Sequence, residues 1–228
     1  MSGRVEVITI DGPSGVGKST ISRCVAVRLN FTYLDTGAMY RAVAFKCRQL
    51  GIAVDDEAAV ARIMPGIDIR LLPARSVQDD VGVLLDGEDV SSSIRTEEIS
   101  MMASAVSALR PVRDRLTLLQ QQAGAGGGVV AEGRDTGTVV FPGAAWKFFL
   151  DASVAERARR RINQLRERRQ EVDEQEIVDQ LVLRDRNDRE RTIAPLAAAP
   201  DALYIDSTDL TADEVTERIL AAVLERAQ

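Results

Sequence analysis

Short apolar runs along the chain alternate with longer segments in which apolar residues recur every three or four positions. The run VEVITI at residues 5–10 is rich in β-branched residues and stops at Asp11-Gly12, which predicts a strand followed by a turn. A glycine-rich loop comes next, and the apolar residues of segment 18–30 then follow helical spacing. The same spacing predicts further helices at 38–50, 96–109, 112–122, 153–169, 173–189 and 211–226.

Three later apolar runs predict further strands, at 129–133, 146–151 and 202–208. The first two suit strands that are buried on both faces of a parallel sheet. Because strands and helices alternate, the pattern predicts an α/β fold of three layers, with a doubly wound parallel sheet in the middle. The 228 residues contain no repeat and no long linker, so we expect one domain over residues 1–228.

Segment 66–95 departs from this alternation. Two runs, IDIRLL at 67–72 and VGVLLDG at 81–87, have the composition of short strands, and Asp86-Gly87 offers a tight turn. They are too close together for a strand–helix–strand crossover. We therefore expect a small inserted subdomain of antiparallel strands at 66–95.

Composition excludes several classes of function. Hydrophobic residues make up 45% of the chain, and the formal net charge of −6 argues against a general nucleic-acid binder. The absence of histidine removes the commonest general base and every histidine-ligated metal site. Cys24 and Cys47 do not have the spacing of a CxxC pair, so we expect two reduced thiols. No run reaches the ~18 apolar residues of a membrane span, so we expect a cytoplasmic protein without a membrane partner.

Basic residues are distributed unevenly between the two types. Of the 29 basic residues only Lys18, Lys46 and Lys147 are lysine, and the other 26 are arginine. The planar fork of arginine suits bidentate binding of phosphate. A compositional bias explains most of these arginines equally well, so only their placement carries information.

The strongest local signal is GPSGVGKS at residues 12–19, which fits G-x-x-x-x-G-K-[ST] without a mismatch. Its glycines allow a tight turn whose N–H groups point at an anion, and the following helix adds a positive N-terminal end. Lys18 can reach the outer phosphates and the Ser19 hydroxyl can hold Mg²⁺. The expected triphosphate contacts are Gly12, Pro13, Ser14, Gly15, Val16, Gly17, Lys18, Ser19 and Thr20.

Polar pairs at 11–12, 35–36 and 134–135 each follow an apolar run. Ligands of open α/β sheets bind beyond the carboxyl ends of the strands, so these pairs should converge on one crevice. A local salt bridge that caps a loop is the alternative explanation for the pair at 134–135. A guanine-reading Asn-Lys-x-Asp motif is absent, because none of the three lysines follows an asparagine.

Six segments together resemble the bacterial cytidylate kinases, a family of nucleoside monophosphate kinases with a P-loop. They are TIDGPSGVGKST, LDTGAMYR, DGEDVSSSIRTEE, EGRDTGTVVFP, KFFLDAS and RDRNDRERTIAPL, in the family's order from residue 8 to 208. The P-loop segment is generic, whereas DGEDVSSSIRTEE and GRDTGTVVFP are far more specific to the family. The resemblance implies transfer of the ATP γ-phosphoryl group to CMP or dCMP with Mg²⁺, giving ADP and CDP or dCDP.

The resemblance also implies where the acceptor binds. Segment 66–95 would be the monophosphate-binding insert, and segment 153–170 an arginine-bearing lid. Arg41 and Arg134 would contact the acceptor phosphate, and Ser104 and Arg113 the cytosine edge beside Asp135. The residues implied for the acceptor site are Thr36, Tyr40, Arg41, Ser104, Arg113, Arg134, Asp135, Arg184, Asp188 and Arg191. Two positions depart from the usual pattern, since the family commonly has serine where Thr36 stands and some members have glycine where Ser19 stands.

The charged stretch RDRNDRER at 184–191 admits two explanations. Arg184, Asp188 and Arg191 follow the spacing i, i+4 and i+7 and therefore share one helical face, while Arg186 and Arg189 point elsewhere. On charge pattern alone a solvated mixed-charge face is the simpler explanation. The resemblance favours function, with Arg184 and Asp188 on the sugar hydroxyls and Arg191 on phosphate.

The predicted helix 153–169 carries arginines at three- and four-residue steps. A basic surface helix is one explanation, and the lid that the resemblance implies is the other. The attacking oxygen of CMP is already anionic, so the reaction needs charge neutralisation more than a general base. The residues expected to take part in catalysis are Lys18, Arg134, Arg157 and Arg161.

Two other functions stay open at this point. One is a kinase for another small acceptor, such as UMP or AMP, and the other is a P-loop switch that hydrolyses ATP without an acceptor. We expect a monomer whose partners are small molecules and not nucleic acid.

Overall fold

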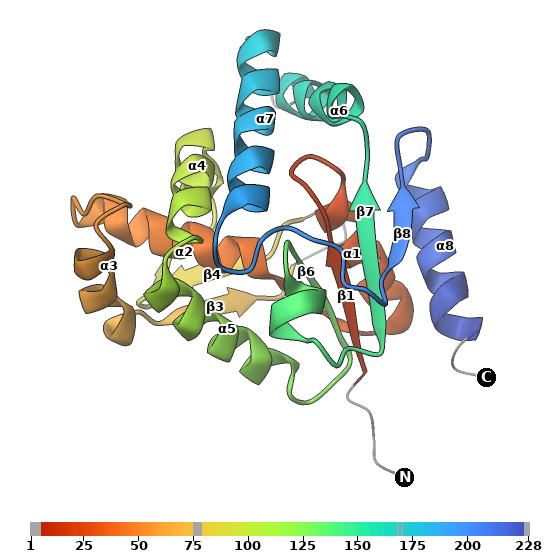
Figure 1. Ribbon diagram of the computed structural model, residues 1–228, viewed down its shortest axis with the longest axis horizontal. Helices are drawn as coiled ribbons and strands as arrows, with labels where there is room; N and C mark the ends of the chain where they lie inside the picture. Colours follow the sequence, from red (N-terminus) through yellow and green to blue (C-terminus); the bar gives the residue numbers. More distant parts are fainter. Residues whose placement is uncertain (1–5, 75–78, 168, 170, 226–228) are drawn as a thin grey trace.

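A five-stranded parallel sheet lies at the centre of the protein (Figure 1). The computed structural model describes residues 6–74, 79–167, 169 and 171–225. The strand order β2-β6-β1-β7-β8 places the first strand in the middle, and every pairing in this sheet is parallel. The strands are β1 (Val7–Asp11), β2 (Thr32–Asp35), β6 (Val129–Gly133), β7 (Trp146–Asp151) and β8 (Leu203–Asp206). The predicted doubly wound α/β fold is confirmed.

Helices cover both faces of this sheet. The first and last helices pack together on one face, over a core that includes Ile8, Ile10, Phe148 and Leu150 from the strands. The short π-helix Thr136–Val140 packs on β1 and β6 at the opposite face, and the fifth helix packs on it. The helices are α1 (Lys18–Leu29), α2 (Thr36–Gln49), α3 (Glu57–Ile63), α4 (Glu97–Val106), α5 (Arg110–Gly124), α6 (Val154–Glu167), α7 (Glu174–Glu190) and α8 (Ala212–Glu225).

A second, antiparallel sheet forms within the predicted insert. It consists of β3 (Ile69–Leu72), β4 (Gly82–Leu85) and β5 (Glu88–Asp89). The turn between β4 and β5 has Asp86 at φ 53° and Gly87 at φ 87°, the left-handed conformation that an Asp-Gly turn accommodates. Short 3₁₀ turns at Met64–Gly66 and Ser93–Arg95 flank the sheet. Residues 75–78 of the predicted insert lie outside the described residues.

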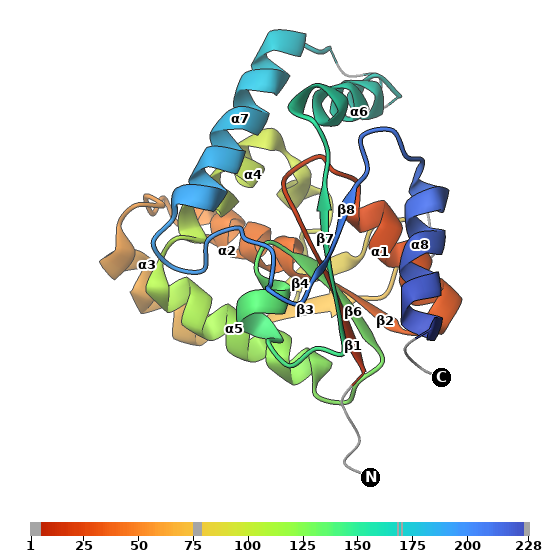
Figure 2. The same ribbon diagram turned by 45° about the vertical axis from the view of Figure 1, so that its right-hand side comes forward.

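Helices α6 and α7 form a pair that stands above the carboxyl end of the large sheet (Figures 1 and 2). They bury a small apolar core of their own between them, formed by Ala158, Ile162, Leu165, Ile177 and Leu181. Residues 168 and 170 of the predicted lid lie outside the described residues. None of the helices in the described part of the chain combines the length and the apolar character needed to span a bilayer.

Besides the 3₁₀ turns, four elements were not assigned from the sequence pattern. These are β2, β5, α3 and the π-helix Thr136–Val140. The apolar run before the pair at 35–36 is short, and β2 has only four residues, so no strand was assigned to it. Helix α3 spans two turns, which is too short for helical spacing to stand out.

Candidate active site

The loop between β1 and α1 has the backbone of a phosphate cradle. Gly12, Gly15 and Gly17 have φ values of 153°, 76° and 98°, which side chains rarely tolerate. At Gly12 a Cβ atom would also lie 2.1 Å from the carbonyl oxygen of Leu150 on β7, so a larger residue would push the loop off the sheet. These glycines let the loop turn back toward α1 and present its amides at the helix N-terminus.

A cavity of about 680 Å³ opens at this loop. Its lining comes from the P-loop, the carboxyl ends of β2 and β6, helices α2, α4, α6 and α7, and the connection from β8 to α8. Among the described residues that line it, ten are lysine or arginine and seven are aspartate or glutamate. The whole chain carries a net charge of −6, so basic side chains are concentrated here against the general balance. The cavity therefore suits anionic ligands.

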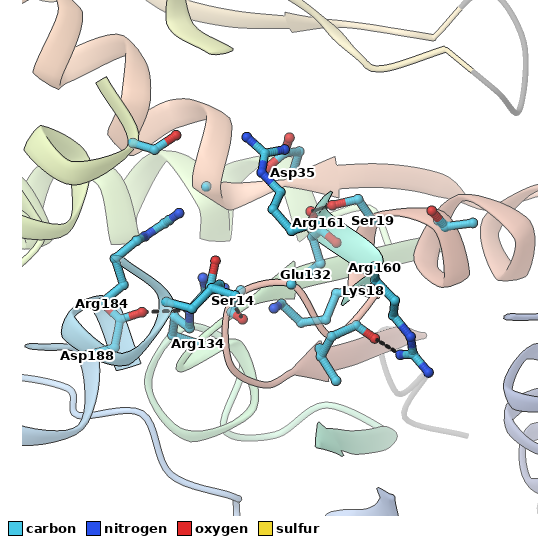
Figure 3. A pocket seen from close by; sticks show the side chains of 18 of the residues that line it. Ser14, Lys18, Ser19, Asp35, Glu132, Arg134, Arg160, Arg161, Arg184 and Asp188 are labelled. Carbon is cyan, nitrogen blue, oxygen red and sulfur yellow. Dashed lines mark hydrogen bonds and ion pairs between the residues drawn. The ribbon is translucent and has the colours of Figure 1, made fainter. Parts of the chain in front are cut away.

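Lys18, Ser19 and Glu132 lie together on the floor of the cavity (Figure 3). Lys18 Nζ donates to the carbonyl oxygen of Pro13 at 2.6 Å, and burial followed by the neighbouring charge of Arg134 lowers its pKa from 10.5 to about 7. Ser19 Oγ and the Tyr33 hydroxyl both donate to Glu132 Oε1 at 2.8 Å. Glu132 Oε2 is buried without a hydrogen-bond partner in the described part of the chain. An uncompensated carboxylate oxygen beside a serine hydroxyl suits a hydrated Mg²⁺ ion.

The buried carboxylate of Asp11 fixes the segment that follows β6. Oδ1 accepts from the backbone N and the hydroxyl of Thr136, at 2.9 and 2.7 Å, and Oδ2 accepts from the backbone N of Gly137 at 2.7 Å. Burial raises the pKa of Asp11 to about 6, although these hydrogen bonds oppose the change. The π-helix thereby starts at a fixed place next to the P-loop, and Arg134 and Asp135 immediately before it are held over the cavity.

Aspartates hold two of the predicted acceptor-phosphate arginines. Arg41 Nη2 lies 3.0 Å from Asp35 Oδ2, and Arg134 Nε lies 2.8 Å from Asp188 Oδ2. Asp188 Oδ1 also accepts from Ser104 Oγ at 3.3 Å, which joins α7 to α4. Burial disfavours the Arg134 cation, but the charge and hydrogen bond of Asp188, together with the charges of Glu132 and Asp185, outweigh this effect and raise the Arg134 pKa.

Arg184 differs from these arginines in having no carboxylate of its own. Among the described residues no ion pair involves Arg184, and its Nε is buried without a hydrogen-bond partner. Burial, followed by the repulsion from Arg134, lowers its pKa to about 10. A guanidinium that is desolvated and not neutralised favours an arriving anion.

A second ionic cluster lies deeper, between α5, α7 and the segment after β6. Asp135 pairs with Arg113 and, at 3.2 Å, with Arg191. The remaining donors of Arg191 bind the Ser107 hydroxyl at 2.9 Å and a backbone carbonyl at 2.6 Å. The guanidinium of Arg113 stacks 5.6 Å from the ring centre of Tyr40. The two guanidinium groups share the Asp135 carboxylate, and Asp188 Oδ1 lies 4.0 Å from Arg191 Nη1, so their charge is largely compensated. Such a cluster of paired donors and acceptors suits an uncharged polar ring more than a phosphate.

Three of the four arginines in the first half of α6, Arg157, Arg160 and Arg161, differ in their surroundings. Arg157 is only 2% exposed and does not line the cavity. Arg160 lines it and donates to Val16 O at 3.1 Å and to Ser207 O at 2.5 Å, so it joins the P-loop to the β8–α8 connection. Arg161 lines it too and pairs with Glu97 on α4, across the cavity.

The structure brings the predicted segments, which are far apart in the sequence, together around one cavity. Arg184, Asp188 and Arg191 all line the cavity, whereas Arg186 and Arg189 are exposed. Arg184 and Asp188 share a face of α7, and Arg191 follows the end of the helix with extended backbone. The predicted residues that line the cavity are Ser14, Gly15, Val16, Gly17, Lys18, Ser19, Thr20, Thr36, Tyr40, Arg41, Ser104, Arg134, Asp135, Arg161, Arg184, Asp188 and Arg191. The predicted residues that do not line it are Gly12, Pro13, Arg113 and Arg157.

Sequence reasoning missed several side chains of the cavity. Glu132 is the second-last residue of β6 and the first residue of EGRDTGTVVFP, and its place at the carboxyl end of a buried strand is a signal that could have found it. Arg23, Asp80 and Arg95 form a linked set, in which Asp80 pairs with Arg23 at 2.6 Å and with Arg95 at 3.1 Å. They come from α1 and the insert, and no spacing in the sequence connects them.

Comparisons with known proteins agree over nearly the whole chain. The model of the family described as "Cytidylate kinase" matches residues 8–225. A cytidylate kinase of Geobacter sp. (strain M21) is 50% identical over 220 residues, which cover 96% of this chain and 93% of that protein. A cytidylate kinase of Pasteurella multocida (strain Pm70) is 44% identical over 223 residues, covering 98% and 96%. Among solved structures, a gluconokinase from Sinorhizobium meliloti 1021 has a similar fold, with a TM-score of 0.50 at 14% identity over 98% of this chain and 94% of that one.

Proposed function

The chain belongs to the cytidylate kinase family, and on this premise we propose how its cavity transfers the γ-phosphoryl group of ATP to CMP or dCMP. Membership gives the chain cytidylate kinase activity, a phosphotransferase reaction. The observation that carries the residue-level proposal is the division of one cavity into a glycine-rich cradle at one end and arginine–aspartate pairs at the other. Such a cavity suits two anionic ligands side by side.

The donor polyphosphate would bind in the P-loop. The amides of residues 15–19 and the Lys18 ammonium would contact the β- and γ-phosphates. Arg160 and Arg161 reach this end of the cavity from α6 and would neutralise charge on the transferring group. We propose that α6 and α7 act as the lid, which excludes water while the phosphoryl group is in transit.

Ser19 and Glu132 would hold Mg²⁺. The Ser19 hydroxyl would contribute one oxygen, and the buried Glu132 Oε2 would accept from water on the ion. Among the described residues no group of three or more carboxylate or thiol side chains could hold a metal ion, so the phosphates and water would complete the coordination. When bound, Mg²⁺ lowers the charge that the attacking oxygen meets.

The acceptor phosphate would bind between Arg41, Arg134 and Arg184. Among the described residues Arg184 has no carboxylate partner, so we assign it to phosphate in place of the sugar contact that the resemblance favoured. Arg41 and Arg134 would share their charge between phosphate and their aspartates, Asp35 and Asp188. The monophosphate oxygen is anionic at neutral pH and attacks without a general base, so these arginines act by positioning and by lowering repulsion.

The nucleoside would lie against the deeper ionic cluster. Asp135 and Arg191 line the cavity and would meet the edge of a pyrimidine, Arg113 holds Asp135 from behind, and Tyr40 supplies an apolar face. We therefore place Arg191 beside the base and not on phosphate, because Asp135, Ser107 and a backbone carbonyl already occupy its donors. The insert at 66–95 would close over this half of the cavity.

An assay of ADP release over a panel of nucleoside monophosphates tests the proposal. CMP and dCMP should give release far above the rate without acceptor, and UMP and AMP much less. Release that is independent of acceptor would point to the hydrolysing switch instead.

Lys18→Ala should lower kcat by ~10²–10³, in the range seen when one electrostatic donor is removed from an active site, with an unchanged circular dichroism spectrum. A full-rate Lys18→Ala enzyme would contradict the assigned donor site.

A further inference from the structure

A buried ion pair ties α6 to α7 behind the P-loop. Arg157 Nη1 lies 2.6 Å from Asp185 Oδ2, and the two residues are only 2% and 4% exposed. Neither lines the cavity. Arg157 Nε also donates to the carbonyl oxygen of Ala152 at 3.0 Å, at the connection from β7 to α6.

Both members of this pair bind the same residue of the P-loop. Arg157 Nη1 donates to the carbonyl oxygen of Ser14 at 3.0 Å, and the backbone N of Ser14 donates to Asp185 Oδ1 at 3.4 Å. The loop is pressed against these helices, because a Cβ atom at Gly15 would lie 3.3 Å from Arg157 O and 3.4 Å from Leu181 Cδ2. The pair therefore holds Ser14 from both of its backbone polar groups.

Stability alone does not account for a pair of this kind. Desolvating two charges costs about as much as their attraction returns, and well-packed apolar residues of similar volume are often as stable or more so. A role in orienting the P-loop explains the buried pair better than stability does. The amides after Ser14 bind an anion well only if they are oriented before it arrives, and two hydrogen bonds on the preceding residue fix that orientation.

The same helix also carries side chains of the acceptor half of the cavity. Asp185 lies between Arg184 and Asp188 on α7, and both of these neighbours face the cavity (Figure 3). A helix moves as a rigid body over this distance. A shift of α7 that accompanies binding of the acceptor must therefore act on Ser14 through Asp185 and Arg157.

We infer that Arg157 and Asp185 are positioning residues that orient the P-loop at Ser14 and couple occupancy of the acceptor site to affinity at the donor site. This inference rests on the proposed assignment of the two sites. Neither side chain touches a substrate. Their effect is transmitted through the Ser14 backbone on one side and through α7, which carries Asp185, on the other.

Two variants separate this role from a structural one. Arg157→Met with Asp185→Leu removes both charges together, so no buried charge is left unpaired and the fold has no electrostatic reason to fail. Arg157→Lys keeps the charge next to Asp185 but cannot reach Ala152 O and Ser14 O at once, because lysine is a single point charge. Arg166→Ala with Glu174→Ala is the matched control, since that pair joins the same two helices at 2.5 Å in solvent.

The measurements are steady-state kinetics and calorimetric titration with the β,γ-imido analogue of ATP, with and without saturating CMP. In the wild type CMP should change the affinity for the analogue by about 5–150-fold, the usual range of coupling between sites. In both Arg157 variants the KM for ATP should rise about tenfold or more, and the KM for CMP should change little. The ratio of the affinities for the analogue with and without CMP should fall toward one. The control variant should match the wild type in every value.

Several results would overturn the inference. A folded Arg157→Lys enzyme with wild-type KM for ATP and wild-type coupling would do so, and this variant decides the matter if the double variant does not fold. Equal affinity for the analogue with and without CMP in the wild type would also do so. A wild type that binds the analogue but does not phosphorylate CMP would refute the proposed function instead, and the effect of Arg157→Lys on analogue binding would still be measurable.

Discussion

The ionisable side chains of the cavity are held by one another at short range. Lys18 lies among Arg134, Glu132, Asp11 and Asp188, which all affect its charge. Arginine stays protonated in such surroundings, but lysine does not have to, because burial alone moves its pKa by units. Lys18 is therefore the cation whose protonation depends on whether a ligand is present.

Binding of the triphosphate should be accompanied by proton uptake. In the free protein burial and then Arg134 hold the Lys18 pKa at about 7, so at pH 8 the amine is mostly neutral. A polyphosphate beside it favours the ammonium, so up to about one proton should enter with the ligand. Titrations at pH 8 in buffers of different ionisation enthalpy measure the number. Lys18→Met should show less uptake than the wild type, and equal uptake in both would exclude Lys18 as the source.

Asp188→Ala should impair the acceptor more than the donor. Asp188 accepts hydrogen bonds from Arg134 at 2.8 Å and from Ser104 at 3.3 Å, so its loss frees two groups of the acceptor half. We expect kcat/KM for CMP to fall about 10–100-fold, which corresponds to ~1.4–2.7 kcal/mol. The KM for ATP should change less than threefold. An equal loss for both substrates in the kinetic assay would assign Asp188 to a shared structural role.

At the scale of elements, the strands and helices with strong periodicity could be predicted, and the short ones could not. Strand β6 is apolar through Val129, Val130 and Ala131, so its pattern is unmistakable. Strand β2 becomes a strand only because β6 offers it a parallel partner, a long-range pairing that local sequence does not encode. The π-helix after β6 depends likewise on the distant carboxylate of Asp11.

Among the cavity residues, too, helical spacing could be predicted from the sequence, whereas contacts with distant elements could not. Spacing predicted that Arg184 and Asp188 share one face of α7, because a helix fixes which positions coincide, and both line the cavity. Arg191 also lines it, although the helix ends one residue earlier. On α6 the spacing identified arginines without telling which face is covered. Arg157 is buried by the P-loop and α7, two elements that come from other parts of the chain.

The contact between Asp11 and the π-helix gives a stability prediction with a definite sign. Burial raises the pKa of Asp11 from 3.8 to about 6, so between these values the folded state binds more protons than the unfolded chain. The contribution of this group to the free energy of unfolding therefore falls as the pH rises from about 4 to about 6. The side chain that Asp11→Asn introduces does not titrate, so the variant lacks this pH-dependent contribution to the free energy of unfolding.

Urea denaturation of the wild type and of Asp11→Asn, between pH 4 and pH 7, measures the difference. The advantage of the wild type over the variant should shrink across this range and then stay constant. A difference that grows as the pH rises would mean that the hydrogen bonds from Thr136 and Gly137 outweigh burial, so that the Asp11 pKa is lowered.

Viewed as a whole, the molecule combines an acidic chain with a basic cavity. The net charge of −6 belongs to the full chain, while basic side chains outnumber acidic ones by ten to seven among the described residues of the cavity. An anion approaching from a distance is repelled by the average field and attracted only near the opening. Salt screens both effects over about 10 Å at 0.1 M.

Ionic strength should therefore act mainly on binding and little on chemistry. From 0.05 to 0.5 M potassium chloride we expect the KM for CMP and for ATP to rise severalfold, with kcat within a factor of about two. Initial rates over both concentration ranges provide the test, with sucrose at equal osmolality as the control. A fall in kcat at constant KM would mean that salt disturbs lid closure and not the arrival of substrate.

The aspartates that hold Arg41 and Arg134 have a consequence for what the empty enzyme attracts. An arginine that is already paired with an aspartate binds free inorganic phosphate weakly, because the phosphate must compete with the carboxylate for the same N–H groups. Inorganic phosphate makes no further contacts that would offset this competition. A nucleotide gains the contacts of its ring and sugar as well, and these can offset the competition. At Arg41 and Arg134 we therefore expect a nucleotide, which brings a base attached to its phosphate, to bind more tightly than free inorganic phosphate.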